Sequence, residues 1–308
     1  MITAYVTHER YPEHNLDEHP EHAGRIRAVW SQLQEGGLTD RLSCLIPQPV
    51  TDEQILSVHT QEHLDRLKWV SQQDKLVLID QDTYALPSSF DIAKLSAGGV
   101  VRAIDEVLSG KAHNAIAAVR PPGHHATPSH SMGFCLLSNI AIGARHAQKQ
   151  YGVKKVLILD YDVHHGNGTQ DIFYTDDSVM FISIHQSPFY PGTGRIGETG
   201  KLEGHRYTLN VPISGGHGDD SYQAIFDDII LAAVEKFDPD LMLISAGFDA
   251  HWADPLAGMR LSLAGYDYIA RECIKMANKV CDGKIVFVME GGYDLKALGH
   301  GWRNIAHA

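Results

Sequence analysis

Five short apolar runs recur along this chain, and amphipathic stretches lie between them. The runs cover residues 115–119, 156–159, 180–184, 241–244 and 285–289. Runs of this length, rich in Val and Ile, are typical of strands buried on both faces of a parallel sheet. Helical patterns fill 139–151, 221–237 and 263–280. Strand and helix in alternation predict an α/β sandwich. No repeat, low-complexity tract or Pro/Ser-rich linker divides the chain, which predicts one domain over residues 1–308.

A loop rich in His, Asp, Gly or Tyr follows each of the five runs. In chain order these loops read RPPGHH, DYDVHHGNG, HQSPFYPGTG, SAGFDAHWADPL and EGGYD. In open α/β sheets, ligands bind outside the carboxyl ends of the strands. The five loops are therefore predicted to bring these side chains to one rim, where they would form a site.

The net charge and the cysteine pattern limit which binding partners and which cellular compartment are expected. The formal net charge of −12 argues against a nucleic-acid surface, which needs a clustered basic face; it suits cationic ligands or serves solubility alone. Four cysteines without a C-x-x-C pair predict a reducing compartment such as the cytoplasm. We see no signal-peptide pattern and no apolar run of the roughly 18 residues that a membrane span needs. No membrane contact is therefore expected.

The loop after the second run has the composition of half a metal site. If 160–164 is extended, Asp160, Asp162 and His164 share one face. Asp249, after the fourth run, can supply a further ligand, although alone it would more often be a turn or capping residue. Two carboxylates and an imidazole suit Zn²⁺ first and Fe²⁺ as an alternative. The competing interpretation is a helix-capping turn, but two acids beside a histidine are costly without a cation.

Two further loops carry candidate catalytic groups. His124 and His125 follow a rigid Pro-Pro-Gly turn, and imidazoles that titrate near neutral pH suit proton transfer; the alternative is a surface pair. Tyr293 follows two glycines. A tyrosine in that position is usually a packing residue, and only the neighbouring loops favour a role as an oxyanion donor.

Two aromatic residues flank these loops. Phe134 and Tyr190 could wall an apolar tunnel, although core packing is the ordinary role of any single aromatic. Gly133 is predicted to serve a tight turn, and Cys135 to be a small buried residue.

Taken together, the motifs RPPGHHA, GFC, DYDVHHGNGT, PFYPGTG, SAGFDAHWADPL and EGGY resemble the signature blocks of the histone deacetylase and acetylpolyamine amidohydrolase family. They occur in the family's order, from about His14 to Tyr293. The resemblance implies an arginase/deacetylase-like fold, a three-layer sandwich around a mostly parallel sheet of about eight strands. It also implies a deacetylase that hydrolyses linear amide bonds.

By matching position, the resemblance implies a role for each motif residue. The zinc ligands would be Asp162, His164 and Asp249, the general acid/base pair His124 and His125, and the group that polarises the carbonyl Tyr293. A structural K⁺ would be held by Asp160, backbone oxygens of Asp162 and His164, and the Ser183 hydroxyl. The substrate would contact Asp82 on a variable rim loop, and Gly133, Phe134, Tyr190 and Leu256.

Asn167 is similar to the class II pattern, where class I has an acid. We expect Asp160 to favour a charged His124, whereas the Asn167 amide leaves His125 closer to neutral. A neutral His125 can take the proton from the attacking water and pass it to the leaving amine. His124 would then act mainly through its charge.

Three functions compete. The first is deacylation of acyl-lysine in proteins or peptides; the second is deacylation of an acetylpolyamine or another small acylated amine. Leu256 favours the first, because the polyamine enzymes that the chain resembles tend to have an acid just after the Asp-Pro pair. The third is a silent acyl-lysine binder, which should have lost a ligand, a histidine or the tyrosine, and none is missing. The pattern predicts no oligomeric state, and it leaves the entrance chemistry around His22 and Arg25 open.

Overall fold

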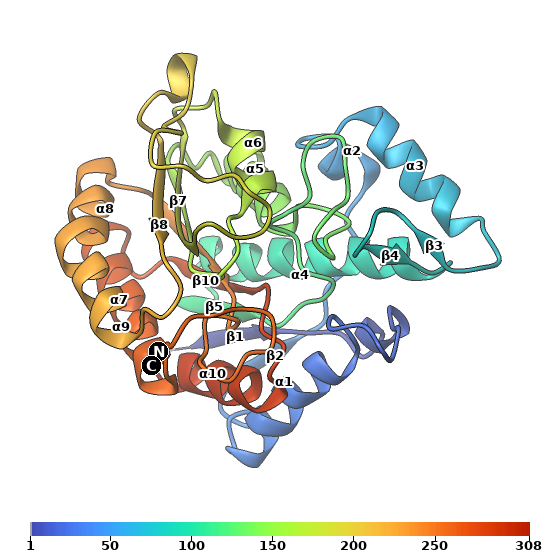
Figure 1. Ribbon diagram of the computed structural model, residues 1–308, viewed down its shortest axis with the longest axis horizontal. Coiled ribbons are helices and arrows are strands. Elements are labelled where there is room, and N and C mark those ends of the chain that lie inside the picture. The colour runs from blue at the N-terminus through green and yellow to red at the C-terminus, as the bar shows by residue number, and fades with distance from the viewer. Residues whose placement is uncertain (1) are drawn as a thin grey trace.

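Eight strands form the central sheet of the computed structural model, which describes residues 2–308 (Figure 1). Their order is β2-β1-β5-β10-β9-β6-β7-β8, and neighbouring strands all pair in parallel. The strands are β1 (Thr3–Val6), β2 (Ser43–Leu45), β5 (Asn114–Ala117), β6 (Val156–Asp160), β7 (Val179–Gln186), β8 (Thr208–Ile213), β9 (Leu241–Ala246) and β10 (Ile285–Met289). A small antiparallel pair, β3 (Val77–Leu78) and β4 (Tyr84–Ala85), lies apart.

Helices fill the connections between the strands. The α-helices are α1 (Gly24–Glu35), α2 (Asp52–Ile55), α3 (Gln61–Ser71), α4 (Ser89–Leu108), α5 (Asn139–Tyr151), α6 (Asn167–Phe173), α7 (Asp219–Ile225), α8 (Leu231–Phe237), α9 (Leu263–Val280) and α10 (Leu295–His307). Two 3₁₀ helices, η1 (Tyr11–Glu13) and η2 (Leu202–Gly204), and one π-helix, η3 (Phe226–Ile230), complete the set. Within residues 2–308, no helix is both long and apolar enough to cross a membrane.

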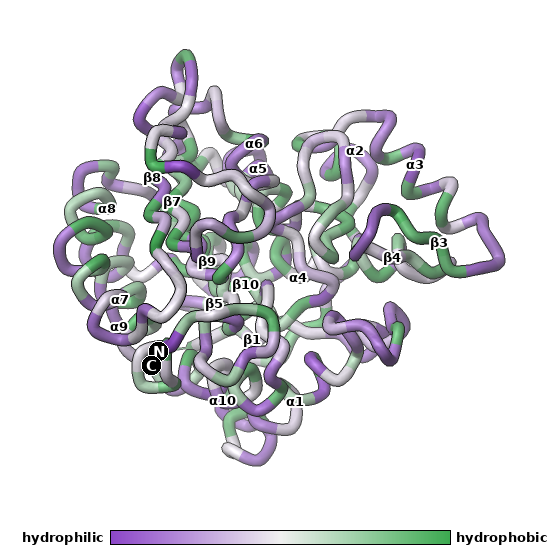
Figure 2. Tube along the Cα trace, in the orientation of Figure 1, coloured by the Kyte–Doolittle hydropathy of each residue, from purple (hydrophilic) through white to green (hydrophobic). Residues whose placement is uncertain are grey.

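The sheet is covered on both faces. Helices α4 and α5 pack together on one side, and α1, α9 and α10 form a contacting group on the other (Figure 1). The central strands are consequently buried along their whole length and mostly apolar, whereas hydrophobic and hydrophilic residues alternate along outer helices such as α8 (Figure 2). Burial of Val, Ile and Leu on both faces explains why these strands appear in the sequence as continuous apolar runs. The predicted mostly parallel, three-layer fold is confirmed.

The bounds of individual elements agree with the sequence patterns in most places. Helices α5 and α9 occupy the predicted ranges, but the helix predicted over 221–237 is three segments, α7, η3 and α8. A π-helical turn inserts one residue into the helical repeat, and a periodic pattern cannot reveal this. Strand β5 ends at Ala117, two residues before the predicted end, because the chain then leaves the sheet toward the histidine pair.

Candidate active site

The predicted site residues lie on loops at the carboxyl ends of four adjacent strands. In the order β5-β10-β9-β6, these loops carry the histidine pair, Tyr293, Asp249, and Asp162 with His164. Parallel pairing puts all four strand ends at the same edge of the sheet. Residues up to 169 positions apart in the sequence, from His124 to Tyr293, are thus brought to one rim.

Asp162, His164 and Asp249 form a buried cluster. Each offers one ligand atom, and these atoms lie within 4.8 Å of one another. His164 Nδ1 is 3.1 Å from Asp162 Oδ1 and 3.2 Å from Asp249 Oδ2. Backbone groups orient the carboxylates, because Gly291 N–H donates to Asp162 Oδ2 (2.7 Å) and Val163 N–H donates to Asp249 Oδ1 (2.9 Å).

The electrostatics of this cluster call for a cation. Among the described residues, no lysine or arginine forms an ion pair with either carboxylate. Burial lowers the pKa of His164, but hydrogen bonds and charge from the two aspartates outweigh burial and raise it to about 10. A divalent ion would satisfy the same carboxylates in place of that proton. Two oxygens and one nitrogen therefore fit Zn²⁺ with positions left open, and Fe²⁺ also suits an oxygen-rich set.

The backbone of residues 160–164 is not extended, so that premise of the sequence argument was wrong. Strand β6 ends at Asp160, and two successive turns follow: Asp160 Oδ1 accepts from Asp162 N–H (3.1 Å) and Asp162 Oδ1 accepts from His164 N–H (2.9 Å). These turns, and no extended backbone, bring the two ligands together. Asp160 pairs with Ser183 across β6 and β7, an adjacency that the K⁺ hypothesis needs; that site stays a prediction.

The two histidines have different partners. His124 Nδ1 lies 2.9 Å from Asp160 Oδ2, and His125 Nδ1 lies 2.8 Å from the Asn167 side-chain oxygen. Burial lowers the pKa of His124, but Asp162 and Asp160 outweigh burial and raise it to about 10. Burial and the nearby His124 and His164 charges hold the pKa of His125 well below its ordinary value. The pKa values of the two neighbouring imidazoles are therefore shifted in opposite directions, upward for His124 and downward for His125.

Tyr293 is held from both sides. The Arg25 guanidinium lies 4.9 Å from the centre of the Tyr293 ring, and its Nε donates to the Gly292 carbonyl (2.8 Å). Asp254 Oδ2 accepts from the N–H groups of Tyr293 (2.7 Å) and Asp294 (3.2 Å). Arg25 therefore braces the tyrosine loop from inside the molecule, which answers the question left open about the entrance. Sequence reasoning missed Asp254, whose only signal was its place in the ADPL motif.

Phe134 and Tyr190 stand beside the candidate catalytic groups. The Phe134 ring is 5.7 Å from the Tyr293 ring, and the Tyr190 ring is 5.2 Å from the His125 ring, both edge to face. Gly133 has a φ of +55°, and a Cβ there would lie 2.3 Å from His125 Cδ2. Gly133 is thus required for a close approach as well as for a turn.

Asp82 and Leu256, the other predicted substrate contacts, are each linked to a site residue by hydrogen bonds. The Thr83 hydroxyl donates to Asp82 Oδ1 and accepts from the Phe134 N–H, both at 3.0 Å. Leu256 is half-buried, and its N–H donates to Asp254 Oδ1 (3.0 Å), the carboxylate that also holds Tyr293. Asp82 is thus linked to Phe134 through Thr83, and Leu256 is linked to the Tyr293 loop through Asp254.

Two further buried residues, Cys135 and Glu290, lie close to His124. Cys135 is buried, and its thiol lies 3.3 Å from the Gly133 carbonyl oxygen. Glu290 is also fully buried, and it accepts hydrogen bonds from the backbone that leads into His124. The sequence signal for Glu290 was a charged residue at the end of an otherwise apolar strand, and our reasoning did not use it.

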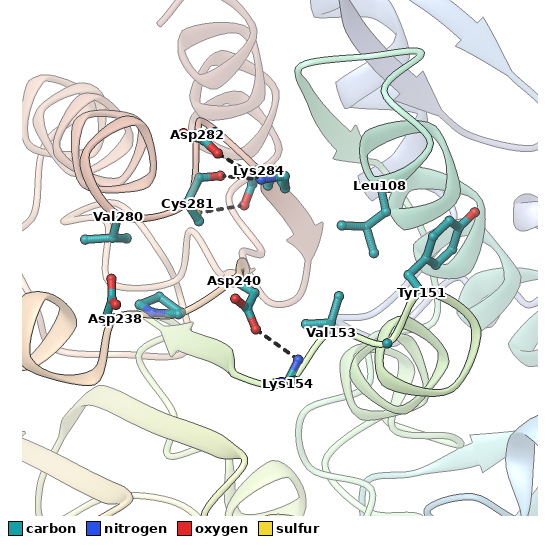
Figure 3. Close-up of a pocket in the computed structure, with 12 residues that line it drawn as sticks. Leu108, Tyr151, Val153, Lys154, Asp238, Asp240, Val280, Cys281, Asp282 and Lys284 are labelled. Carbon is teal, nitrogen blue, oxygen red and sulfur yellow. Dashed lines mark hydrogen bonds and ion pairs between the residues drawn. The ribbon is translucent and has the colours of Figure 1, made fainter.

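A separate pocket opens at the other edge of the sheet, where β6, β9 and β10 begin (Figure 3). Its lining includes Lys154, Asp240, Asp282 and Lys284, and none of the predicted site residues. Asp240 Oδ2 is occupied by the N–H groups of Lys154 and Lys155 (2.9 Å each), and Lys284 pairs with Asp282 at 3.3 Å. These contacts lie where the preceding helices end and the strands begin.

Comparison with known proteins extends over nearly the whole chain. The family model of the histone deacetylase domain matches residues 19–308. A probable deacetylase of Archaeoglobus fulgidus is 44% identical, over 96% of this chain and 82% of its own length. The histone deacetylase-like amidohydrolase of Pseudomonas aeruginosa is 41% identical, over 90% and 72%. The crystal structure of the HDA15 HD domain aligns with a TM-score of 0.94 and 39% identity, over 99% and 87%.

Proposed function

Because this chain belongs to the histone deacetylase family, we propose that it is a zinc-dependent amidohydrolase that removes acetyl or other acyl groups from lysine side chains of proteins or peptides. One observation supports this most strongly: the buried Asp162–His164–Asp249 cluster lies beside two histidines, one hydrogen-bonded to the Asp160 carboxylate and the other to the Asn167 amide. Such a set can hold a metal and move a proton within the same few ångströms.

The first half of the reaction is the attack of water on the acyl carbonyl. Zinc bound by Asp162, His164 and Asp249 would supply Lewis acidity to the scissile carbonyl and to water. His125, whose pKa is held low by burial and by the neighbouring His124 and His164 charges, accepts a proton from the water that attacks the carbonyl carbon. The Tyr293 hydroxyl donates a hydrogen bond to the carbonyl oxygen as negative charge develops there.

The second half of the reaction breaks the C–N bond. His125 then gives its proton to the leaving amine, so that carboxylate and free amine are released. His124, kept protonated by Asp160, supplies positive charge next to the developing oxyanion. Phe134 and Tyr190 would flank the uncharged methylenes of the acyl-lysine, and Asp82 would bind the substrate backbone at the rim.

A small acylated amine is the second candidate substrate. The Asp80 and Asp82 carboxylates lie on the loop that is linked to Phe134, and carboxylates at a tunnel mouth would attract the ammonium groups of an acetylpolyamine. Against this, Leu256 puts an apolar side chain on the opposite rim loop. We therefore expect acyl-lysine peptides to be preferred. We also propose a reducing, cytoplasmic location, which the four free cysteines support.

The test combines metal analysis with a substrate panel. The zinc-loaded protein is assayed at moderate salt against acyl-lysine peptides of several acyl lengths and against acetylspermidine. Asp249→Asn should lose zinc and activity together, because it removes an anionic ligand from a three-ligand site. Full zinc occupancy in that variant would contradict the metal assignment. A higher kcat/KM for acetylspermidine would replace the lysine substrate with the polyamine.

A further inference from the structure

Glu290 is a buried carboxylate that the proposed mechanism does not use. It directly follows β10, which lies between β5 and β9 in the sheet. Its side chain is 0% exposed, and within residues 2–308 no lysine or arginine is ion-paired with it. An unpaired carboxylate in the interior is costly unless hydrogen bonds compensate it, so its contacts indicate what it is for.

The carboxylate connects three strands. Its Oε2 accepts from the N–H of Gly123 (2.7 Å) and of His124 (3.2 Å), in the loop after β5. Its Oε1 accepts from the Ser245 hydroxyl on β9 (3.2 Å). The backbone carbonyl of Glu290 itself accepts from Arg25, the residue that also holds the tyrosine loop.

These bonds hold the middle of the histidine loop, residues 120–126, whose start is held by Asn139 at the Pro121 carbonyl. The Gly123 and His124 N–H groups have no other acceptor among the described contacts. The loop cannot shift freely either, because a Cβ on Gly123 would already lie 2.5 Å from the Asn139 nitrogen. Leaving a buried N–H unpaired costs about 1–3 kcal/mol, so the loop should follow the position of the Glu290 oxygens.

We propose that Glu290 is a positioning residue for deacylation, whose carboxylate holds the backbone of the histidine loop and so sets where the His124 and His125 imidazoles stand. This inference rests on the proposed function and adds a residue to it. Because Gly291, Gly292 and Tyr293 follow directly, one residue fixes the histidine loop through its side chain and begins the tyrosine loop through its backbone. The position of Glu290 therefore affects both the histidine loop and the tyrosine loop.

Two substitutions distinguish the effect of the length of the Glu290 side chain from the effect of its charge. In Glu290→Gln the amide oxygen can accept from both N–H groups and the amide nitrogen can donate to Ser245 Oγ, so every hydrogen bond survives while the charge is lost. In Glu290→Asp the charge survives, but the side chain is one methylene shorter and no longer reaches the loop. Ser245→Ala is the matched control, since it removes only the contact to β9.

The experiment measures hydrogen exchange and turnover on the zinc-loaded full chain. Glu290→Asp should speed amide exchange in peptides that cover 120–126 and lower kcat by about 10²-fold, with KM little changed, since small displacements of catalytic groups cost this much. Glu290→Gln and Ser245→Ala should keep both the exchange rate and kcat close to those of the unmodified chain. Rates are normalised to bound zinc, so loss of fold or metal is not counted.

Several outcomes would overturn the inference. If Glu290→Gln is impaired and Glu290→Asp is not, the carboxylate acts through its charge on His124. If Glu290→Asp lowers only the melting temperature, with kcat per zinc intact, the role is structural. If Glu290→Asp does not fold, a loss of turnover or faster exchange in Glu290→Gln still refutes positioning. Absence of activity in the unmodified protein would instead refute the proposed function, and the exchange measurement would remain valid.

Discussion

At the scale of single residues, the two adjacent histidines have different hydrogen-bond partners and pKa shifts of opposite direction. An imidazole that is hydrogen-bonded to a carboxylate gains a strong preference for the charged form. His124 has such a partner in Asp160, whereas His125 has the neutral Asn167 amide. Asp162 and Asp160 raise the pKa of His124, whereas burial and the charges of His124 and His164 lower the pKa of His125.

This difference predicts unequal effects of the two alanine variants. His125→Ala should lower kcat by about 10² to 10⁴-fold, because it removes the group that carries the proton. His124→Ala should cost less, since it removes a charge and leaves the proton path intact. Steady-state rates across a pH series, with zinc content checked in both variants, give the comparison. A larger loss in His124→Ala, together with a missing limb of its pH–rate profile, would reverse the two roles.

Tyr293 offers a test of the carbonyl contact. Tyr293→Phe keeps the ring against Phe134 and Arg25 and removes only the hydroxyl. Zinc content should be unchanged, and turnover should fall by about 10² to 10³-fold, as for the loss of one oxyanion donor. Turnover near that of the unmodified enzyme on acetyl-lysine peptide would mean that the tyrosine only packs.

At the scale of elements, the sequence predicted best where burial is complete. Strands β6, β9 and β10 are buried along their length, so their apolar runs stand out, and the polar loops after them point to the rim. Strand β2 has three residues and no fully buried position, so composition gives little signal for it. The loops that brace the site were harder still, because Asp254 and Glu290 act on backbone groups that no side-chain pattern displays.

Helix α4 requires a glycine at position 98, where the backbone of Gln48 packs directly against the helix. A Cβ on Gly98 would lie 1.9 Å from the Gln48 carbonyl oxygen. Gly98→Ala should therefore destabilise the protein by about 1–3 kcal/mol, because a backbone clash outweighs the higher helix propensity of alanine. Gly197→Ala is the control, because a Cβ on Gly197 would meet no atom within 4 Å. Thermal melts of both should show a lower midpoint only for Gly98→Ala; equal midpoints would refute the clash.

At the scale of the whole molecule, a buried carboxylate ties the N-terminal segment to the sheet. Glu21 lies 2.7 Å from Arg120 and 3.0 Å from Arg25, and all three side chains are fully buried. Burial raises the pKa of Glu21, but the two arginines outweigh burial and lower it from 4.5 to about 2. The folded state therefore prefers the charged form, which is worth on the order of 3 kcal/mol above pH 4.5.

The lowered pKa of Glu21 predicts how the free energy of unfolding changes at acid pH. The contribution of Glu21 is complete above its ordinary pKa of 4.5 and is lost as the pH falls toward about 2. Glu21→Gln should be several kcal/mol less stable at pH 7, since it leaves buried arginines without their counter-ion. The gap to the unmodified chain should narrow below about pH 4.5 in urea unfolding experiments. A constant gap down to about pH 3 would show that Glu21 does not contribute in this way.

The place of β10 in the sheet has a consequence for biosynthesis. The ribosome makes this strand last, yet it lies in the middle, between β5 and β9. Until residue 289 has emerged, the nascent chain can build only two half-sheets, β2-β1-β5 and β9-β6-β7-β8, each with an open hydrogen-bonding edge. Such edges recruit other strands. We therefore expect nascent chains to require chaperone binding late in translation. We also expect fragments that end before β10 to aggregate.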